Sequence, residues 1–479
     1  MTQPTQFDLN PDRLLPPEQP TRDIARTLYE SVKDLPIISP HGHVPIEWFA
    51  EDMHFSDPTS LFITPDHYVT RIMHSQGVNL ADLGVNQKHF TAEQARNAFL
   101  LFGKHWASYA GTPMRYWFQD SLRNVFGITK PFGPDTAGEI YDELNELLAT
   151  DEFTTRKLVK KFNIGFISTT DDPAADLKLH DEVRADAAFP ARLAPAFRPD
   201  RYLEATRSDW RDLVDELGES AGVNASTYEG FYEAMRRRRL YFKEHGAVCS
   251  DHGVDPSNFS CWDGDTTRLS DEEASKLFNE AYKGVISVED AHRLHSHFIA
   301  DQAKLAQDDE LVMTVHPGVM RNHSRKHFIE FGPDSGADCP MPADFGHWLR
   351  PVLNEYGNNP DFHLVAFTMD ETAYSRELAP MCGYYPALYL GAPWWFLDAP
   401  ESILRYFADV VPFAGFTKLS GFIDDTRALC SIPARHDMNR RLTSRFVAGL
   451  VADHRLSLDE GLTIVHDAVE TQPTKVFKL

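Results

Sequence analysis

The sequence predicts an α/β protein built as a (β/α)8 TIM-like barrel, and three observations support this fold. Eight short apolar runs are spread along the 479 residues, and each stops abruptly at polar residues. Segments with helical periodicity lie between these runs, and such alternation indicates a parallel sheet. Nearly every run is followed by a His, Asp, Arg or Trp, as expected if the carboxyl ends of barrel strands face one cavity.

The runs are short and rich in β-branched and aromatic residues, as strands are. In chain order they are PIIS (36–39), NIGFISTT (163–170), RLAPAF (192–197), GAVCS (246–250), ELVMTV (310–315), FHLVAFT (362–368), ALYLGAP (387–393) and AGFTKLSGFI (414–423). The residues at or just beyond their ends are His41, Asp171, Arg198, Asp251, His316, Asp370, Trp394 and Asp424. Turn-forming aspartates end strands in many proteins, but that alternative explains neither the histidines nor the arginine nor the tryptophan.

The helical segments account for the rest of the chain. Residues 271–284 and 290–306 have the periodicity of barrel helices. A barrel of this kind needs about 250 residues, so a single domain over residues 1–479 carries a large surplus. Most of the surplus falls at 45–160, where stretches at 91–111 and 138–150 predict a helical insertion after the first strand. A smaller surplus at 252–290 predicts a loop or cap.

Charge and hydropathy exclude several classes of partner. The net charge of −24 would repel nucleic acid and anionic membranes. The run Arg236–Arg239 is interpreted as a solvated helix face rather than a binding patch. No apolar run reaches 18 residues, and residues 1–20 lack the pattern of a secretory leader, so we expect a cytoplasmic protein with no membrane partner.

The cysteines point away from both disulfides and a cysteine-bound zinc. They are odd in number, widely spaced and never in a CxxC motif. We expect all five to be reduced core residues: Cys249, Cys261, Cys339, Cys382 and Cys430.

The residues that follow the first, fifth and eighth runs suit a divalent metal. His41 and His43 are two positions apart, so they point to the same side if a strand ends there. Together with His316 and Asp425 they offer imidazole and carboxylate ligands, which favour Zn²⁺, with Mn²⁺ or Fe²⁺ as alternatives. A single histidine is more often a core residue, but three such positions at strand ends are a more specific pattern.

A set of motifs in this order resembles the uronate (glucuronate) isomerase family of the amidohydrolase superfamily. The motifs are HGH at 41–43, PDHYVTR at 65–71, NELLATDEF at 145–153, TTDDP at 169–173, FRPD at 197–200, SDH at 250–252, HPGVMRNH at 316–323, GAPWWF at 391–396 and DDTRALCSIPARHD at 424–437. The resemblance covers nearly the whole chain. It implies a barrel of the amidohydrolase type and a homo-oligomer.

The resemblance also implies roles for individual residues. His41, His43 and Asp425 match the metal-binding positions of the family, and His316 matches a further site histidine. The substrate-pocket residues of the family are matched in this chain by Tyr68, Arg198, Asp251, Trp394 or Trp395, and Arg427. The chain departs from the family pattern at Gly42, between the two histidines, and at Asp424, which predicts an extra carboxylate in the site.

The implied reaction is the interconversion of an aldose and a ketose form of a small-molecule sugar acid, D-glucuronate to D-fructuronate or D-galacturonate to D-tagaturonate. A proton moves between C2 and C1 through an enediol, which requires a base and groups that protonate the oxygens. Asp425 is the first candidate base and Tyr68 the alternative, with Tyr68 and His316 as proton relays. Arg198 and Arg427 suit the carboxylate of the substrate, although either could form a structural salt bridge.

The sequence leaves open the roles of three further residues, Asp251, Trp394 and Trp395. Asp251 could bind a substrate hydroxyl or orient a histidine, and Trp394 and Trp395 could pack against the sugar.

A mononuclear metal-dependent hydrolase is the alternative enzyme. A site with two metals is disfavoured because no lysine follows the fourth run. A sugar-acid binding protein without activity is the third reading.

Overall fold

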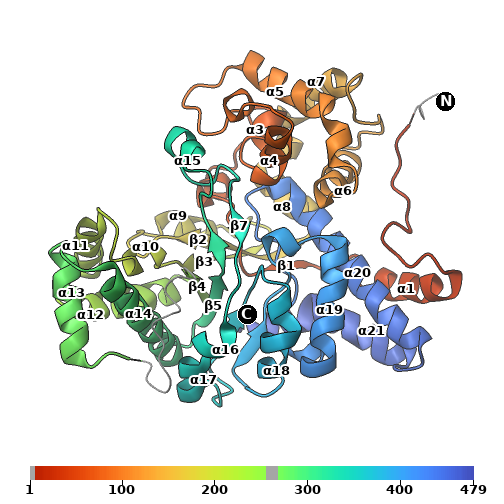
Figure 1. Ribbon diagram of the computed structural model, residues 1–479. Coiled ribbons are helices and arrows are strands. Elements are labelled where there is room, and N and C mark those ends of the chain that lie inside the picture. Colours follow the sequence, from red (N-terminus) through yellow and green to blue (C-terminus); the bar gives the residue numbers. More distant parts are fainter. Residues whose placement is uncertain (1–5, 255–267) are drawn as a thin grey trace.

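The computed structural model describes residues 6–254 and 268–479, and a parallel sheet of seven strands lies at its centre (Figure 1). The strands lie side by side in chain order. They are β1 (Ile37–Ser39), β2 (Ile164–Asp171), β3 (Arg192–Phe197), β4 (Cys249–Val254), β5 (Val312–Pro317), β8 (Leu364–Ala366) and β9 (Leu388–Leu390). The first seven predicted runs each overlap one of these strands, so the predicted α/β fold with a parallel sheet is confirmed.

The eighth run, residues 414–423, does not form the predicted strand. Its centre is the short 3-10 helix η8 (Phe416–Lys418), followed by one parallel bridge from Leu419 to Leu390 of β9. The glycines at 415 and 421 have φ of 67° and 81°, which interrupts an extended chain. A Cβ at 421 would lie 2.7 Å from Pro473, so the backbone also approaches the C-terminal segment closely.

Helices connect successive strands. Between β2 and β5 they are α9 (Lys178–Ala185), α10 (Asp200–Leu203), α11 (Trp210–Ala221), α12 (Tyr228–Glu244), α13 (Asp271–Tyr282) and α14 (Val288–Asp309). After β5 come the hairpin β6 (Val319–Met320) and β7 (Cys339–Pro340), and the helices α15 (Arg325–Phe331), α16 (Phe345–Trp348), α17 (Arg350–Tyr356), α18 (Ala379–Cys382) and α19 (Pro400–Ala414). The predicted helices at 271–284 and 290–306 correspond to α13 and α14.

The segment between β1 and β2 contains helices and no strand among its residues. They include α2 (Ile46–Glu51), α3 (Pro58–Phe62), α4 (His67–Ser75), α5 (Ala92–Lys104), α6 (Pro113–Asp120), α7 (Ala137–Leu148) and α8 (Thr155–Lys161). Figure 1 shows α3 to α7 gathered in a lobe above the sheet. Aromatic rings fill this lobe: Phe99, Phe102 and Phe118 contact one another and Phe132.

Segments near both ends of the described chain pack against other parts of the fold. Helix α1 (Gln19–Val32) lies along α20 (Ile432–Ala452). The C-terminal Val476 and Phe477 join a buried cluster with Val312 of β5 and Val365 of β8. This apolar cluster extends to Trp394 and therefore reaches the carboxyl ends of the strands.

The predicted solvated face at Arg236–Arg239 is wrong for half of its residues. Arg236 and Arg237 are exposed and pair with Glu233. Arg238 and Arg239 are buried, and Arg239 pairs with Asp309 of α14 at 2.6 Å. Consecutive helical residues lie about 100° apart around the axis, so four of them cannot share one face.

The described cysteines are free thiols, of which Cys249, Cys382 and Cys430 are buried and Cys339 is partly buried. Cys261 lies outside the described residues, as does part of the predicted loop at 252–290. No described helix is both long and apolar enough to span a bilayer.

Candidate active site

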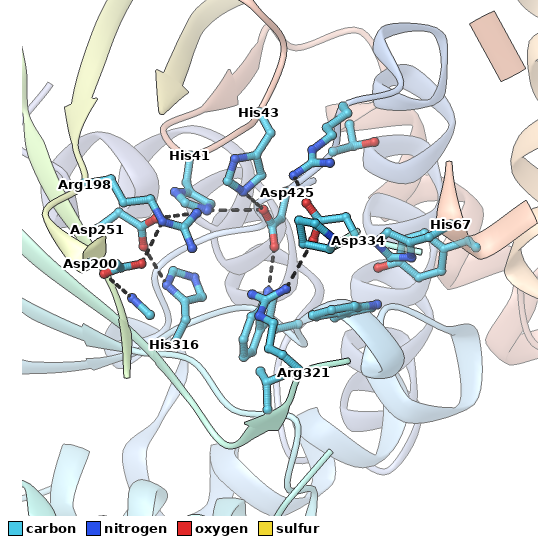
Figure 2. Close-up of a pocket in the computed structure, with 18 of the residues that line it drawn as sticks. His41, His43, His67, Arg198, Asp200, Asp251, His316, Arg321, Asp334 and Asp425 are labelled. Carbon is cyan, nitrogen blue, oxygen red and sulfur yellow. Dashed lines mark hydrogen bonds and ion pairs between the residues drawn. The ribbon is translucent and has the colours of Figure 1, made fainter. Parts of the chain in front are cut away.

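A cavity of about 460 Å³ opens at the carboxyl ends of the strands, a size typical of small-molecule sites. Its walls come from the segments after several strands and from the start of α4 (Figure 2). The structure brings together in it all ten site residues that the sequence predicts: His41, His43, Tyr68, Arg198, Asp251, His316, Trp394, Trp395, Asp425 and Arg427.

His41, His43 and Asp425 form one group of potential metal ligands. Asp425 Oδ1 lies 3.2 Å from Nε2 of His41 and 2.9 Å from Nε2 of His43. One ligand atom from each residue lies within 4.8 Å of the others. The Trp394 indole N–H donates to Asp425 Oδ2 at 2.6 Å and so fixes the carboxylate. The backbone N–H of His43 donates to the Thr426 carbonyl at 3.1 Å, which joins the two segments.

The backbone turns at Asp425, where φ is 42°. Residues other than glycine adopt this left-handed conformation uncommonly, and such strain recurs at functional sites. The chain is therefore not extended through Asp425 on its way to Arg427. Both side chains nonetheless line the cavity.

The charges in this group are set by burial and by the neighbouring side chains. Burial raises the pKa of Asp425, but the imidazoles beside it outweigh burial and hold that pKa well below its usual range. Burial lowers the pKa of His43. Burial also acts to lower the pKa of His41, but Asp251 and Asp425 outweigh it and leave that pKa raised. Asp425 is therefore an ionised carboxylate at neutral pH.

His316 belongs to a second group, with Asp251 and His41. Its Nδ1 lies 2.8 Å from Asp251 Oδ1, which also accepts a hydrogen bond from Thr314 Oγ1 at 3.1 Å. The His316 ring stacks on His41 on one side and on Phe367 on the other, with centroids 4.9 and 4.3 Å apart. Burial lowers the pKa of His316, so the ring is neutral and Asp251 orients it.

Arg198 links the second group to the end of β4. Its Nη1 lies 3.3 Å from Asp251 Oδ2, and its Nε donates to Asp200 Oδ2 at 2.8 Å. Asp200 in turn accepts from the backbone N–H of Gly253 at 2.9 Å. Burial raises the pKa of Asp251, but His41, Arg198 and His316 together hold it well below its usual range. The charge of Arg198 is thus matched by two carboxylates.

The start of α4 supplies the wall from the helical lobe. The carboxylate of Asp66 accepts from the backbone N–H of Tyr68 at 2.9 Å and so caps the helix. His67 stacks on Tyr68 with centroids 4.8 Å apart and lies 5.1 Å from the Trp395 ring. Burial raises the pKa of Tyr68, so its hydroxyl stays protonated.

Asp424 is directed away from the cavity. It is buried, accepts from Ser39 Oγ at 2.5 Å and lies 3.1 Å from His436 Nε2. The extra carboxylate predicted for the site therefore supports the end of β1 from behind. The reason is that Asp424 and Asp425, as neighbours in the chain, point in different directions.

The sequence reasoning missed several residues that line the cavity, among them His67, Asp200, Arg321 and Asp334. The first three lie inside the motifs PDHYVTR, FRPD and HPGVMRNH, so those motifs carried the signal. Asp334 lies in a loop after α15, where no strand end marked it.

Comparison with known proteins gives the family. Residues 19–477 match the family model described as glucuronate isomerase. The chain belongs to the glucuronate isomerase family. Among relatives of this family, the uronate isomerase of Cutibacterium acnes is 50% identical over 479 residues and covers 100% of both chains. The uronate isomerase of Corynebacterium efficiens is 44% identical over 99% of this chain and 100% of its own.

Solved structures of glucuronate and uronate isomerases share the fold. The glucuronate isomerase of Caulobacter crescentus is 40% identical, with a TM-score of 0.94 over 99% of this chain and 97% of its own. The uronate isomerase of Thermotoga maritima is 27% identical, with a TM-score of 0.90 over 98% and 100%. A Lactobacillus casei protein that is described as a metal-dependent hydrolase, 12% identical with a TM-score of 0.55, is alike in fold alone. The chain thus shares its fold with solved members of this family.

Proposed function

We propose that this chain interconverts the aldose and ketose forms of hexuronates, taking D-glucuronate to D-fructuronate and D-galacturonate to D-tagaturonate. One observation carries the proposal. The cavity holds imidazoles and an ionised carboxylate around His41, and a separate pair of arginines, Arg321 and Arg427, beside Asp334. An open-chain uronate has a reactive aldehyde at one end and a carboxylate at the other, so the cavity offers chemistry suited to each end.

The group of His41, His43 and Asp425 fits a divalent cation, for which we propose Zn²⁺ first and Mn²⁺ or Fe²⁺ as alternatives. Asp425 Oδ1 is buried and lies near two imidazole nitrogens without a hydrogen bond of good geometry. A bound cation would polarise the substrate oxygens. His316 lies with Asp251 and His41, so we assign it to proton transfer rather than to the same ion.

Asp425 is the group that we propose as the base. Its carboxylate takes the proton from C2, the C2–H electrons form the C1–C2 double bond, and the aldehyde oxygen gains a proton to give the enediol. Asp425 then returns the proton to C1 while the hydroxyl on C2 loses its proton and becomes the ketone. Tyr68 is the alternative base, but its raised pKa keeps it protonated and suits it to donate instead.

The proton that moves between the two oxygens needs a carrier. The hydroxyl of Tyr68 and the imidazole of His316 both line the cavity. Asp251 orients His316 through the 2.8 Å contact with Nδ1 and leaves Nε2 without a partner among the described residues. We propose that this Nε2 and the Tyr68 hydroxyl exchange protons with the oxygens on C1 and C2, and that Trp394 and Trp395 pack against the sugar.

The experiment that tests the function follows carbon-bound protons by NMR. The protein is incubated with glucuronate and with galacturonate in deuterated water, with the Asp425→Asn variant as control. We expect the ketose at unchanged mass apart from exchanged deuterium, and loss of turnover in the variant by about a hundredfold or more. Products that gain the mass of water would point to a hydrolase, and no turnover of either sugar acid would refute the substrate.

We also propose that the eighth run closes the sheet into a (β/α)8 barrel. It contacts β9 through the Leu390–Leu419 bridge and the hydrogen bond from Ser420 N to Leu390 O at 2.8 Å. On the other side Thr426 accepts the hydrogen bond from His43, just after β1. In this proposal residues 45–160 are an insertion within one domain.

The remaining proposals concern the cellular location and the oligomeric state of the protein. We propose that it works in the cytoplasm, supported by the free thiols of the described cysteines. We also propose a homo-oligomer, supported by Phe328 and Ile329 of α15, whose side chains are exposed. Light scattering of the purified protein measures the oligomeric state, and a monomer would refute the proposed homo-oligomer.

A further inference from the structure

Tyr68, the proposed proton carrier that comes from the helical lobe, is held in the described structure by ring contacts. Its backbone N–H donates to Asp66, but no hydrogen bond with another described residue reaches its hydroxyl. A phenol ring turns about side-chain torsions, so neighbouring groups must fix where the hydroxyl points. These groups are His67, whose ring stacks on it at 4.8 Å, Trp117, whose ring meets it edge-on at 5.8 Å, and Arg435.

Arg435 lies near the start of α20, and its buried guanidinium contacts aromatic rings of the helical lobe. The guanidinium carbon is 3.8 Å from the ring centroid of Trp117 in α6 and 5.1 Å from that of Tyr68 in α4. In Figure 1 the start of α20 lies just below these two helices. A cation is attracted to the face of an aromatic ring, and more strongly where water is excluded. The side chain of Arg435 is 1% exposed, so water is excluded from this contact.

Hydrogen bonds to three residues fix the guanidinium of Arg435 in place. Its Nη1 donates to Asp398 Oδ2 at 3.1 Å and to the Asp424 carbonyl at 3.0 Å, and its Nε donates to Ser431 Oγ at 3.2 Å. Asp424 is the residue before Asp425, the proposed base. Arg435 therefore connects the segment that carries the base with the phenol ring in the helical lobe.

We propose that Arg435 is a positioning residue for the isomerisation: it holds the Tyr68 ring so that the hydroxyl lies beside the substrate oxygens. This inference rests on the proposed function, because it takes Tyr68 as a proton carrier. The charge of Arg435 adds to the effect. Burial raises the pKa of Tyr68, and the guanidinium acts against burial, so the hydroxyl gives up its proton more readily than it would without Arg435.

Arg435→Lys tests this inference, because lysine keeps the charge but lacks the flat guanidinium that lies over both rings. The kcat for glucuronate is expected to fall about tenfold, since a misplaced catalytic group loses part of its contribution. The KM is expected to stay within about twofold of the wild type, because Tyr68 acts in the chemical step. A variant with the wild-type kcat would overturn the inference.

The same change in a Tyr68→Phe background shows whether Arg435 acts through Tyr68. With no hydroxyl left to position, Arg435→Lys is expected to lower the remaining kcat by less than about twofold. A purely structural role of Arg435 would lower kcat by about tenfold in this background too. That additive result would refute action through Tyr68.

Arg440→Lys is the matched control. Arg440 is another buried arginine of α20, and it donates to the backbone carbonyls of Lys33 at 2.7 Å and Pro36 at 3.0 Å. These carbonyls precede β1, at the amino ends of the strands, whereas the cavity opens at the carboxyl ends. We expect the wild-type kcat from this control, and circular dichroism checks the folding of both variants. An equal fall in kcat in the two variants would overturn the inference.

Trp117→Phe takes the place of Arg435→Lys if the lysine variant does not fold. The smaller ring reduces the contact with both the guanidinium and Tyr68. The kcat is expected to fall about threefold, and again only while Tyr68 is present. An unchanged kcat in Trp117→Phe would contradict the inference.

A spectroscopic measurement separates this inference from the proposed function. The protein is labelled with fluorotyrosine, and the fluorine NMR resonance of Tyr68 is identified by its absence from Tyr68→Phe. We expect this resonance to shift or broaden in Arg435→Lys and to stay unchanged in Arg440→Lys. An unchanged resonance in Arg435→Lys would refute the inference. If the wild type converts no uronate, the proposed function fails, and this resonance still decides whether Arg435 positions Tyr68.

Discussion

The neighbouring tryptophans Trp394 and Trp395 contact different groups, although both are buried at the cavity wall. Trp394 donates its indole N–H to Asp425. Trp395 has no hydrogen-bond partner for its indole nitrogen among the described residues, and its ring lies beside His67 and near Arg321, whose guanidinium is 5.1 Å from the ring centroid. Two residues of one type and similar burial therefore provide a matched pair of variants.

Trp394→Phe is expected to lower kcat about tenfold, because it removes a hydrogen bond to a buried carboxylate, worth about 1.5–3 kcal/mol. Trp395→Phe loses a similar volume but no such bond, so its kcat is expected to stay within about twofold. Steady-state kinetics with circular dichroism as a check on folding measure both variants. An equal loss in the two variants would contradict the role of Trp394.

His67 gives a prediction on pH. Burial, with a contribution from Arg427, lowers its pKa to about 4 from an ordinary value of 6.5. The folded protein binds this proton less tightly than the unfolded chain, so the stability linked to the neutral ring is complete above pH 6.5 and is lost as the pH falls toward 4. Urea unfolding at pH 7 and pH 4.5 should show a smaller loss for His67→Gln than for the wild type. A histidine titration by NMR with a midpoint near 6.5 would contradict this.

At the scale of single residues, the sequence located most of the site. Each of the ten residues that it predicted lines the cavity. The residues that follow strands do so because the carboxyl ends of parallel strands meet at the same end of the sheet, whereas Tyr68, which lies in α4, was indicated only by the family resemblance. The sequence could not assign the partners of these residues. The separation of His316 from His43, and the pairing of Asp334 with Arg427, depend on distances across the cavity that no local pattern contains.

Helix α12 shows how an element decides what its residues do. Its four consecutive arginines divide between a solvent face and the interface with α14, where Arg239 donates to Asp309 and to Gln302. A buried charge must be paired, since burial removes its hydration. The same residue type in one run is therefore structural at one position and replaceable at the next.

Arg239→Met is expected to destabilise the protein by about 3–5 kcal/mol, because it leaves the buried Asp309 without its cation. Arg237→Met removes an exposed pair with Glu233 on the same helix and is expected to change stability by no more than about 0.5 kcal/mol. Urea unfolding followed by fluorescence measures both. Equal midpoints for the two variants would contradict the assignment.

The first seven runs were correctly predicted to be strands, whereas the eighth run was not. Seven runs were identified because a buried parallel strand must be nearly continuous in apolar residues. The eighth run has the same composition, yet two glycines with positive φ and the approach of Pro473 turn it into a short helix and a bridge. The composition of the run cannot predict the contact with Pro473, because Pro473 lies about fifty positions later in the chain.

In the molecule as a whole, the candidate metal ligands follow the first and the last segments of the sheet. His41 and His43 follow β1, the first strand, and Asp425 follows the eighth run. A ligand that binds only the folded state stabilises it. A cation bound by all three would therefore connect the first segment of the sheet to the last.

Removal of metal by a chelator is expected to lower the melting temperature by several degrees, and addition of Zn²⁺ or Mn²⁺ is expected to restore it. The Asp425→Asn variant, which lacks one of the three ligands, should show a smaller shift. Differential scanning fluorimetry together with elemental analysis measures both. A melting temperature independent of metal in the wild type would exclude this site as a stabilising one.

The sequence by itself determined the parallel α/β fold, the order of its first seven strands and the residues at their carboxyl ends, because these follow from local periodicity and from the direction of parallel strands. Only the tertiary structure decided which of those residues touch: that Asp425 faces both His41 and His43, that Asp424 turns away, and that Asp334 reaches Arg427. The physical reason is that periodicity fixes the side of a strand or helix to which a residue points, whereas a hydrogen bond or ion pair depends on how separate segments pack.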